Sequence, residues 1–466
     1  MTSRRQERII DMKQFQNVII GFGKGGKTLA GTLAQKGQTV ALIERSPMMY
    51  GGTCINVACI PTKSLENSAR LSAAQGGSFA EKAERYRAAV AEKRRLTAML
   101  RQKNYDKAAS SGAVIYTGQA SFEDAHHVRV VLTDGTEEVL EAERIFVNTG
   151  ARPAAPDIQG LEGNPYVYSS ETLMEREELP RHLVILGGGY IGLEFASYFA
   201  NFGSQVTMVQ RDEKFLPRED AEVAAAVLES LTARGVTVLR ATETRGVDAV
   251  ENGAVVHIEK DGTVSELTAD AVLVATGRRP NLEGLAVEKA GLIVTPRGAL
   301  QVDEHLQTNV SHIWAMGDVA GGQQFTYISL DDFRVVKSQL LGHGGRTTAN
   351  RGPVPYSVFL DPPFSRVGMT EAEALAKGLE VRVARLPAAA IPKAQVLRKP
   401  VGMLKAVVDA KTGLILGAHL FCAESQEMIN LVKLAMEAKI PYTALRDGIF
   451  THPTMTEALN DLFAAL

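Results

Sequence analysis

Two segments of the chain repeat one local pattern, and this repeat constrains the fold more than any other feature of the 466-residue sequence. Residues 17–45 and 182–211 each contain a short apolar run, a glycine-rich turn, a helical stretch closed by a glycine, and a second apolar run. This order is typical of a strand, helix, strand unit in a parallel sheet. We therefore predict an α/β chain that contains two such units.

The sequence around these units predicts further elements. Residues 114–150 and 246–277 contain short alternating runs with Asp-Gly or Asn-Gly turns, which are typical of β-meanders. Residues 64–110 are rich in Ala, Glu, Lys, Arg and Leu, which favours helices with a charged, solvated face. From about residue 343 the pattern changes to mixed strands and helices, so we expect a separate C-terminal domain there.

Length and charge exclude several classes of protein. At roughly 150 residues per domain, the chain is long enough for about three domains. Its 51 basic and 53 acidic residues leave no positive excess for nucleic acid or an anionic membrane surface. Three cysteines are too few for a secreted disulfide scaffold, and no apolar stretch approaches the roughly 18 residues of a membrane helix. We expect a soluble cytoplasmic protein, with residues 1–15 as a flexible extension that lacks a signal-peptide pattern.

The first glycine-rich turn has the spacing of a dinucleotide-binding site. Gly21, Gly23 and Gly26 form the pattern G-x-G-x-x-G after an apolar run, and Glu44 ends the next run. The glycines allow a tight turn, a close approach of a diphosphate and helix packing, while the acid accepts a hydrogen bond from a ribose. With all of these parts in place, the pattern predicts a bound dinucleotide rather than a plain turn.

The second turn repeats this spacing but ends differently. Its three glycines are Gly187, Gly189 and Gly192. The place of the acid is taken by Gln210, which is followed by Arg211. A guanidinium beside a neutral amide suits a 2′-phosphate, which a carboxylate would repel, so the pattern favours NADPH. NADH is the alternative if Arg211 is only a solvated residue. Two weaker phosphate candidates are Lys214 and Arg218.

Cys54 and Cys59 lie at the glycine-rich entry to the predicted helical segment, within GGTCINVACIPTK. At a loop-to-helix junction this spacing can bring two sulfurs into bonding geometry, and a helix N-terminus lowers the pKa of a thiol. A redox-active pair is one interpretation; two buried apolar cysteines or half of a metal site are the others. Near the C-terminus, His452 and Glu457 are a candidate acid/base pair, although a histidine at a helix start is more often structural.

Six motifs occur in one order along nearly the whole chain: GFGKGG, GGTCINVACIPTK, GGGYIGLEFA, ATGRRPN, AMGDVA and HPTMTE. Over about residues 17–460 the chain resembles the pyridine nucleotide-disulfide oxidoreductases, the class I flavoprotein disulfide reductases. The sequence around these motifs is most similar to a reactive-chlorine-resistance branch. That branch is related to mercuric reductase and associated with reduction of Cu(II) and Hg(II).

The resemblance implies two Rossmann-like dinucleotide-binding domains with β-meanders and an α+β C-terminal dimerisation domain. Because AMGDVA, a motif of the FAD site, follows the second glycine turn, the NAD(P) domain is expected as an insertion. The expected FAD-binding domain covers 16–150 and returns over 279–342. The expected NAD(P)-binding domain covers 151–278, and the dimerisation domain covers 343–466.

The resemblance also implies FAD at the first glycine turn and NAD(P)H at the second. Tyr190 resembles a mobile ring over the flavin, and Lys63 and Glu194 resemble a pair beside it, where a cation stabilises the reduced ring. The expected cofactor-binding residues are Gly21, Gly23, Gly26, Glu44, Gly52, Thr53, Lys63, Gly150, Asp318, Gly187, Gly189, Tyr190, Gly192, Arg211 and Gly277.

The expected catalytic residues are Cys54, Cys59, His452, Glu457, Lys63 and Glu194. By resemblance, Cys59 is the thiolate that faces the flavin, and Cys54 is the interchange thiol that meets the substrate. His452, paired with Glu457, would come from the other subunit and act as acid/base on Cys54. The resemblance therefore implies a homodimer.

The preferred electron acceptor is a soft metal ion, because two thiolates are a ready ligand pair for copper or mercury in a defence against reactive chlorine or metal stress. Ala58 stands where the family usually has glycine. The chain also lacks the C-terminal cysteine pair of mercuric reductases and has His452 where they have Tyr. For these last two reasons a dedicated mercury reductase is not expected. Alternatives are reduction of a small or protein disulfide as in glutathione reductase, a component like dihydrolipoamide dehydrogenase, and a non-catalytic redox-sensing flavoprotein. Cys422 is expected in the core, without a role.

Overall fold

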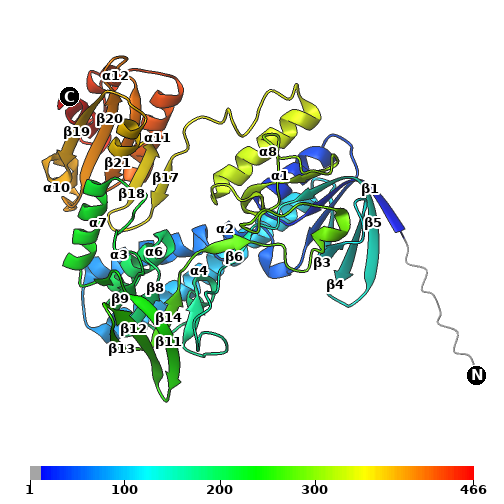
Figure 1. Cartoon of the computed structure of the whole chain (residues 1–466), viewed down its shortest axis with the longest axis horizontal. Helices are drawn as coiled ribbons and strands as arrows, with labels where there is room; N and C mark the ends of the chain where they lie inside the picture. The colour runs from blue at the N-terminus through cyan, green and yellow to red at the C-terminus, as the bar shows by residue number, and fades with distance from the viewer. Residues whose placement is uncertain (1–11) are drawn as a thin grey trace, which may run out of the picture. The chain divides into compact units, whose positions relative to one another are not determined.

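Residues 12–466 are described by the computed structural model, and they form two units with separate cores (Figure 1). Unit 1 contains the described residues up to Pro61, Glu92–Ala154 and Arg278–Arg351. Unit 2 contains Thr62–Ala91, Ala155–Gly277 and Gly352–Leu466. The chain therefore passes several times from one unit to the other.

Unit 1 is centred on a six-stranded sheet in the order β1-β2-β3-β4-β5-β16, in which β1 also pairs with β5. The pairs that involve β1, β2 and β16 are parallel, while β4 pairs antiparallel with β3 and β5. Helices α1 and α8 pack on each other beside this sheet. The elements are β1 (Met12–Ile20), α1 (Lys24–Ala34), β2 (Val40–Glu44), α2 (Thr53–Asn56), β3 (Val114–Phe122), β4 (His127–Leu132), β5 (Glu137–Val147), β6 (Ala151–Pro153), β15 (Arg278–Pro280), β16 (Ile313–Ala315) and α8 (Thr326–Leu341), with short 3₁₀ turns at Pro47–Met49, Val287–Ala290 and Gly317–Ala320.

The start of β1 corrects part of the expected flexible extension. Met12 is already paired with Val139 of β5, and Phe15 lies edge-on to Tyr116. Residues 12–15 are therefore strand, because the sheet gives them backbone partners and an aromatic contact. The remaining part of the expected extension, residues 1–11, lies outside the described residues.

Unit 2 contains a parallel sheet in the order β10-β9-β8-β14-β7, an antiparallel sheet β11-β12-β13 and an antiparallel C-terminal sheet β17-β18-β21-β20-β19. Helix α11 packs on the C-terminal sheet, and α6 packs on the parallel one. The elements are β7 (Val167–Ser169), α5 (Ser170–Leu173), β8 (His182–Leu186), α6 (Tyr190–Phe202), β9 (Gln205–Val209), α7 (Ala221–Ala233), β10 (Thr237–Leu239), β11 (Glu243–Val250), β12 (Gly253–Lys260), β13 (Thr263–Ala269), β14 (Ala271–Val274), β17 (Tyr356–Val358), β18 (Phe364–Gly368), α9 (Glu371–Ala376), β19 (Val381–Pro387), the 3₁₀ turn Ala388–Ala390, α10 (Pro392–Val396), β20 (Met403–Asp409), β21 (Ile415–Phe421), α11 (Ser425–Glu437), α12 (Tyr442–Arg446) and α13 (Ala458–Ala464).

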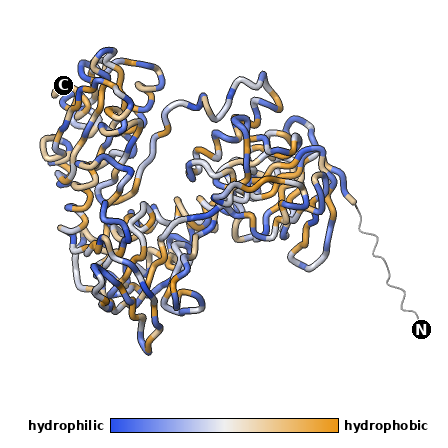
Figure 2. The backbone as a smooth tube through the Cα atoms, in the orientation of Figure 1, coloured by the Kyte–Doolittle hydropathy of each residue, from blue (hydrophilic) through white to orange (hydrophobic). Residues whose placement is uncertain are grey.

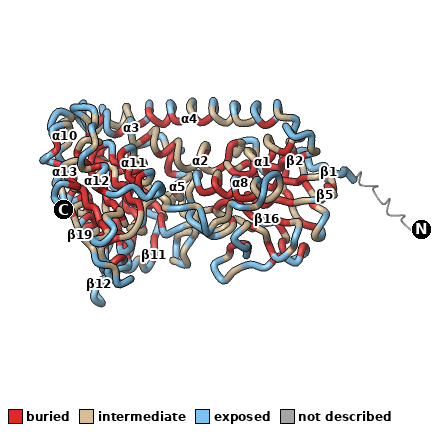
Figure 3. The backbone as a smooth tube through the Cα atoms, turned by 90° about the horizontal axis from the view of Figure 1, so that it is seen from above, coloured by how far each residue is buried: buried red, intermediate tan, exposed pale blue. Residues whose placement is uncertain are grey.

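The predicted helical segment 64–110 forms two helices, α3 (Cys59–Gln75) and α4 (Phe79–Ala109), which are separated at Gly76 and Gly77. Buried and exposed residues alternate along α4 (Figure 3), so much of its charge is solvated as expected. Lys93 is an exception, because only 1% of it is exposed. Both helices are divided between the two units.

Apolar residues are concentrated in the strands of the parallel sheets (Figure 2), and β2 is buried along its whole length. This continuous burial is typical of strands that are covered on both faces. The predicted α/β class, with two strand, helix, strand units, β-meanders and an α+β C-terminal region, is confirmed. Across residues 12–466, none of the helices combines the length and apolar character that crossing a membrane requires.

The two units do not coincide with the expected domains, and residues 62–91, expected in the FAD-binding domain, belong to unit 2. The cuts at Ala154 and Gly277 lie close to the expected boundaries at 150 and 278, where β6 pairs with β15. However, the expected NAD(P)-binding and dimerisation domains fall within one unit. A shared core explains this, because Phe364 and Phe421 of the C-terminal sheet belong to the same apolar cluster as Phe195 and Phe199 of α6.

Candidate active site

The first glycine turn lies between β1 and α1, and its glycines leave the backbone there uncovered by side chains of their own. Gly21 has a φ of +107°, and a Cβ atom there would lie 2.4 Å from the carbonyl oxygen of Asn148. Gly52 has a φ of +81°, and its Cβ atom would lie 2.7 Å from the Cα atom of Gly23. The loop that precedes Cys54 therefore touches the turn through backbone atoms. Bare backbone at a helix start suits the close approach of a diphosphate.

Two carboxyl groups, that of the buried Glu44 and that of the largely buried Asp318, belong to the same unit as this turn. Glu44 ends β2 and accepts hydrogen bonds from the amides of Phe22 at 3.2 Å and Ser46 at 3.3 Å. Burial raises the pKa of Glu44, and it raises the pKa of Asp318 to about 6 although the charge of Arg278 opposes this shift. A carboxylate can accept roughly four hydrogen bonds, so Glu44 keeps capacity for the hydroxyl groups of a ribose.

These residues fit FAD. The bare turn suits its diphosphate, and the carboxyl groups of Glu44 and Asp318 suit its ribose and ribityl hydroxyl groups. Gly150 also lies next to Thr53, because a Cβ atom on Gly150 would be 3.6 Å from the Thr53 Oγ1 atom. Lys63 and Glu194, the pair expected beside the flavin, belong to unit 2 instead.

Cys54 and Cys59 lie at two successive helix starts in unit 1. Both are half-buried free thiols; Cys54 lies in α2 and Cys59 begins α3. The pKa of Cys54 is raised, mainly because its thiol hydrogen-bonds with Cys59 and further because it is buried. The Cys59 Sγ atom lies 3.6 Å from Thr326 Oγ1. The two thiols therefore interact directly, and the pair favours a proton on Cys54 over a thiolate there.

The alternatives for this pair can be compared with the geometry. The two cysteines are neither fully buried nor far apart, whereas Cys422 is completely buried against Met428 in the C-terminal core. Burial raises the pKa of Cys422 to about 12, which keeps it inert as a thiol. Within residues 12–466, no group of three or more His, Cys, Asp or Glu side chains could hold a metal ion.

The sequence analysis missed three residues beside the cysteine pair: Lys27, Asn104 and Thr326. Lys27 Nζ donates to the carbonyl oxygen of Gly51 at 3.1 Å and to Asn104 Oδ1 at 2.5 Å. Burial lowers the pKa of Lys27 to about 8, and the charge of Cys54 acts in the opposite direction. Lys27 directly follows the first glycine pattern, which was a visible signal. Asn104 and Thr326 gave no signal, because they are 77 and 267 residues from the partners they bond.

The second glycine turn, in unit 2, leaves an open helix start. Cβ atoms on Gly187 and Gly192 would lie 2.5 Å from Ala275 O and 2.3 Å from Gly187 O, but a Cβ atom on Gly189 or Gly277 would meet no other atom within 4 Å. The turn is thus closely packed on the protein side and open on the other. This arrangement suits a second diphosphate.

The end of β9 carries the residues expected to read the ribose. Gln210 is buried, and its Nε2 donates to the backbone carbonyls of Asp212 at 2.7 Å and Lys214 at 3.2 Å. The side chain of Gln210 therefore orders the loop that follows. Three exposed cations lie on this loop: Arg211, Lys214 and Arg218.

Tyr190 begins α6 and is held by a buried acid that the sequence analysis missed. Its hydroxyl donates to Glu219 Oε1, and the hydroxyl of Tyr356 donates to the same oxygen at 2.7 Å. The Glu219 side chain is 1% exposed and faces Arg366 at 3.4 Å. Burial raises the pKa of Tyr190 to about 12, so its hydroxyl remains a donor at neutral pH. Glu219 and Tyr356 gave no sequence signal, because they lie 29 and 166 residues from Tyr190.

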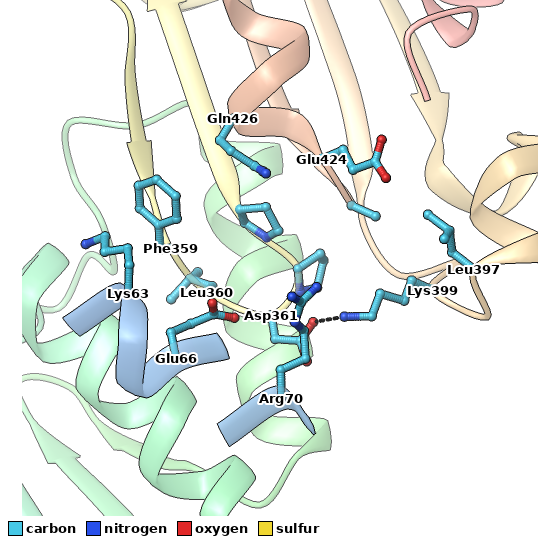
Figure 4. Close-up of a pocket in the computed structure, with 13 residues that line it drawn as sticks. Lys63, Glu66, Arg70, Phe359, Leu360, Asp361, Leu397, Lys399, Glu424 and Gln426 are labelled. Atoms are coloured by element: carbon cyan, nitrogen blue, oxygen red, sulfur yellow. Dashed lines mark hydrogen bonds and ion pairs between the residues drawn. The ribbon is translucent and has the colours of Figure 1, made fainter. Parts of the chain in front are cut away.

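Lys63 and Glu194 form an ion pair in unit 2, with Nζ to oxygen distances of 2.7 and 2.9 Å. Glu194 also accepts from the amide of Phe359 at 2.9 Å, and the Lys63 Nζ lies 4.6 Å from the centre of the Phe359 ring. Lys63 and Phe359 line a cavity of about 270 Å³ (Figure 4). In the cavity, burial raises the pKa of Glu66 to about 7, and Asp361 pairs with Lys399 at 2.8 Å.

His452 and Glu457 also form the expected pair, with 2.9 Å between His452 Nδ1 and Glu457 Oε2. Glu457 is fixed by a hydrogen bond from the amide of Thr454 at 3.3 Å, whereas the side chain of His452 is 70% exposed. Ile449 nearby in sequence is fully exposed. The imidazole is thus oriented by an acid and directed toward the surface of its own unit.

The structure assigns the expected residues to both units. Unit 1 holds the first glycine turn, Glu44, Asp318 and the two cysteines, while unit 2 holds the second glycine turn, the Lys63–Glu194 pair and His452. Each unit therefore carries its own part of the expected chemistry.

Comparisons with known proteins identify the family of the chain. A family described as pyridine nucleotide-disulphide oxidoreductase matches residues 15–332, and the dimerisation domain of that family matches residues 354–463. The probable pyridine nucleotide-disulfide oxidoreductase RclA of Escherichia coli (strain K12) is 49% identical over 97% of this chain and 99% of its own length. A solved structure, the Cu(II) complex of the HOCl-induced flavoprotein disulfide reductase RclA from Escherichia coli, matches with a TM-score of 0.92 and 48% identity, covering 97% of this chain and 99% of that one.

More distant relatives have other printed activities. Dihydrolipoyl dehydrogenase of Mycobacterium bovis is 33% identical over 98% of both chains, and mercuric reductase of Staphylococcus aureus is 32% identical over 98% of this chain and 84% of its own. The predicted resemblance is confirmed by these matches. Matched along both of its glycine turns and its C-terminal sheet, the chain belongs to the pyridine nucleotide-disulphide oxidoreductase family.

Proposed function

We propose that this oxidoreductase takes electrons from NAD(P)H through FAD to a Cys54–Cys59 disulfide and passes them to a soft metal ion such as Cu(II) or Hg(II). The observation that carries the proposal is the direct interaction between the half-buried thiols of Cys54 and Cys59 at two helix starts. The Cu(II) complex of RclA, which shares 48% of its sequence with this chain, supports copper as the acceptor. Its description as HOCl-induced supports a role in defence against reactive chlorine.

FAD, when bound, would accept a hydride from NAD(P)H and supply an electron pair to the disulfide. The bare turn at Gly21, Gly23 and Gly26, with Gly52, would hold its diphosphate. Glu44 and Asp318 would bind its hydroxyl groups, because both carboxyl groups are buried and have acceptor capacity. Thr53 and Gly150 would line the same site.

The cysteine pair would then carry the electrons to the acceptor. Breaking the S–S bond takes up two electrons and one proton, and gives a thiolate on Cys59 and a thiol on Cys54, as the raised pKa of Cys54 favours. Reforming the S–S bond releases two electrons and that proton. Two Cu(II) ions would each accept one electron, or one Hg(II) ion would accept both, and thiolates are the ligands that such soft ions prefer.

NADPH is the favoured donor. Gly187, Gly189 and Gly192 would hold its diphosphate, next to Gly277. No carboxylate stands at the end of β9, and the exposed cation of Arg211 follows the buried amide of Gln210. A 2′-phosphate would gain a charge-assisted hydrogen bond there.

Lys63 and Glu194 would act as a positioned charge pair beside the cofactor. Glu194 holds the ammonium group at 2.7 Å, and this fixes where the positive charge lies. A fixed cation stabilises negative charge that develops on reduction better than mobile water does. Tyr190 would cover the nicotinamide site, and its hydroxyl is anchored on Glu219.

His452 would act as acid/base on Cys54 of the partner subunit in a homodimer. The dimerisation domain over residues 354–463 supports the dimer, and the exposed imidazole with its fixed Glu457 supports a proton exchange across the interface. Glu457 holds Nδ1, which leaves Nε2 for the proton of the thiol. The scarcity of cysteines supports a reducing, cytoplasmic setting.

Anaerobic reduction of the holoenzyme tests this proposal. We expect NADPH to produce a long-wavelength thiolate-to-flavin absorption band, and Cu(II) or Hg(II) to restore the oxidised spectrum through many turnovers. Cys54→Ser should keep the band and lose turnover, whereas Cys422→Ser is the matched control and should change neither. Flavin reduction without any such band would overturn the proposed path through the cysteines.

A disulfide substrate is the second candidate, and the retained His452–Glu457 pair favours it, because a leaving thiolate needs a proton whereas a reduced metal ion does not. Oxidised glutathione and lipoamide in the same assay distinguish the candidates. Turnover of either one at a rate that exceeds that with Cu(II) and Hg(II) would make disulfide reduction the main activity.

A further inference from the structure

Asn148 directly follows β5 and lies behind the first glycine turn. It is 5% exposed, and both ends of its side-chain amide are bonded. Oδ1 accepts from the amide of Gly26 at 2.8 Å, and Nδ2 donates to the carbonyl oxygen of Met316 at 2.6 Å. Since one partner is a donor and the other an acceptor, only this orientation of the amide satisfies both.

The bonds of Asn148 decide which helix amides remain for a ligand. The first four amides of a helix have no partner within the helix, and in α1 these belong to Gly23, Lys24, Gly25 and Gly26. Gly25 donates to Ser329 Oγ at 3.1 Å and Gly26 donates to Asn148. In the described chain, no protein atom takes the amides of Gly23 and Lys24. The protein thus satisfies the two inner amides and leaves the two outer ones.

Asn148 also fixes the shape of the turn and its distance from the return segment. A Cβ atom on Gly23 would lie 2.6 Å from Asn148 Oδ1, and one on Gly317 would lie 3.0 Å from Asn148 Nδ2. Gly317 precedes Asp318, and its amide donates to Asp332 at 2.7 Å. The same side chain therefore touches the glycine turn and the segment that carries Asp318.

We propose that Asn148 is a positioning residue for FAD, which sets the distance between the diphosphate-binding amides of α1 and the hydroxyl-binding segment at Asp318. This inference rests on the FAD site of the proposed function. Asn148 does not touch the cofactor; it acts through Gly26 and Met316. Loss of its side chain frees the amide of Gly26 and the carbonyl of Met316, so the two halves of the site lose their common support.

FAD affinity of the apoprotein tests this role. Flavin-free native protein, Asn148→Ala and Asn17→Ala are titrated with FAD by flavin fluorescence, and each protein is melted with and without FAD. Asn17 is a matched control, because it is also a buried asparagine of unit 1 whose Nδ2 is bonded, at 2.9 Å to Gln38, but its side-chain bonds reach Gln38 and Thr39 and not the glycine turn.

We expect Asn148→Ala to weaken FAD binding by about 10–100-fold, because the variant loses two buried hydrogen bonds. Asn17→Ala should also lower the melting temperature, but it should change the FAD affinity by less than about 2-fold. Equal losses of melting temperature in the two variants with unchanged FAD affinity in both would overturn the inference. If Asn148→Ala does not fold, Ser329→Ala is the second variant, because it frees the amide of Gly25 and removes the longer, 3.4 Å bond from Asn148 Nδ2 but keeps the bonds of Asn148 to Gly26 and Met316. It should weaken FAD binding less, by about 3–10-fold, and unchanged affinity would then overturn the inference. Native protein that binds no FAD would instead refute the proposed function.

Discussion

At the scale of single residues, Glu66 in the cavity of unit 2 is held half-protonated near neutral pH (Figure 4). Burial is the largest cause that raises its pKa from 4.5 to about 7, and the charge of Arg70 opposes the shift. Because the folded-state pKa is the higher one, the unfolded chain loses its proton first as the pH rises. Native stability is therefore lost between about pH 4.5 and pH 7, by at most about 3 kcal/mol.

We expect Glu66→Gln to remove this pH dependence. The melting temperature of the variant minus that of the native protein should grow as the pH rises from 4.5 to 7 and stay constant above pH 7. Glu84→Gln, which changes an exposed glutamate of the same unit, serves as the control and should give a flat difference. A flat difference for Glu66→Gln as well would mean that the carboxyl group titrates like one in water.

Arg211 is the residue that we expect to distinguish the two nicotinamide cofactors. Arg211→Gln should lower kcat/KM for NADPH by about 10–100-fold, which corresponds to one charge-assisted hydrogen bond, and leave kcat/KM for NADH within about 2-fold. Arg240→Gln is the control, because Arg240 is a partly exposed cation that donates to the carbonyl of Glu213 on the same loop at 3.3 Å. Equal losses with both cofactors would place Arg211 outside the ribose site.

The residues that the sequence could and could not predict differ in where their partners lie. The glycines of the two turns and the Cys54–Cys59 pair could be proposed from the sequence, because their spacing sets the geometry within one short segment. Asn148, Lys27 and Glu219 were missed, because their bonds reach across 168, 77 and 29 or more residues. A local pattern cannot show which distant segment will supply a hydrogen-bond partner.

At the scale of elements, α7 is fastened to the C-terminal sheet by one buried cation. Lys405 of β20 is 2% exposed, and its Nζ lies 2.8 Å from Asp220 at the start of α7, from Glu222 and from Glu371. Asp220 also caps α7 through the amide of Glu222 at 3.1 Å. The cation therefore neutralises acids that the fold brings together from the starts of two helices, α7 and α9.

We expect Lys405→Met to lower the free energy of unfolding of unit 2 by about 3–5 kcal/mol, because Asp220 would remain buried without its counter-ion. Lys411→Met is the control, since Lys411 is 72% exposed and its 3.3 Å pair with Glu380 should contribute less than about 1 kcal/mol. Differential scanning calorimetry of the holoenzyme measures both. A loss in Lys405→Met as small as that in Lys411→Met would show that water screens the network.

The elements of the chain were predictable where their period is regular. The parallel strands and the long helices followed from apolar runs and from the composition of residues 64–110. The order β17-β18-β21-β20-β19 did not follow, because these strands are three to seven residues long and pair out of sequence order. Strand order depends on packing of the whole C-terminal region, which no single segment encodes.

At the scale of the whole molecule, the proposed role of His452 predicts that a complete active site needs two chains. The imidazole is oriented by Glu457 yet 70% exposed, and the fully exposed Ile449 lies three positions before it. An oriented but exposed acid/base is what we expect where a second subunit supplies the thiol that exchanges its proton. The test is complementation between two inactive variants, Cys54→Ser and His452→Ala.

Each homodimer of these variants should have little activity, because every site lacks either the thiol or the imidazole. A mixed dimer has one site with both defects and one site in which the native Cys54 meets the native His452 of the partner. Equal mixing with free exchange of subunits gives about half mixed dimers, so about a quarter of the native rate should return with a disulfide substrate, the reaction for which the proposal requires His452. Differently tagged subunits allow the mixed dimer to be purified, and it should then reach about half of the native rate. If His452 served the cysteines of its own chain, no site in the mixed dimer would be intact and the activity would stay at the level of the two parents.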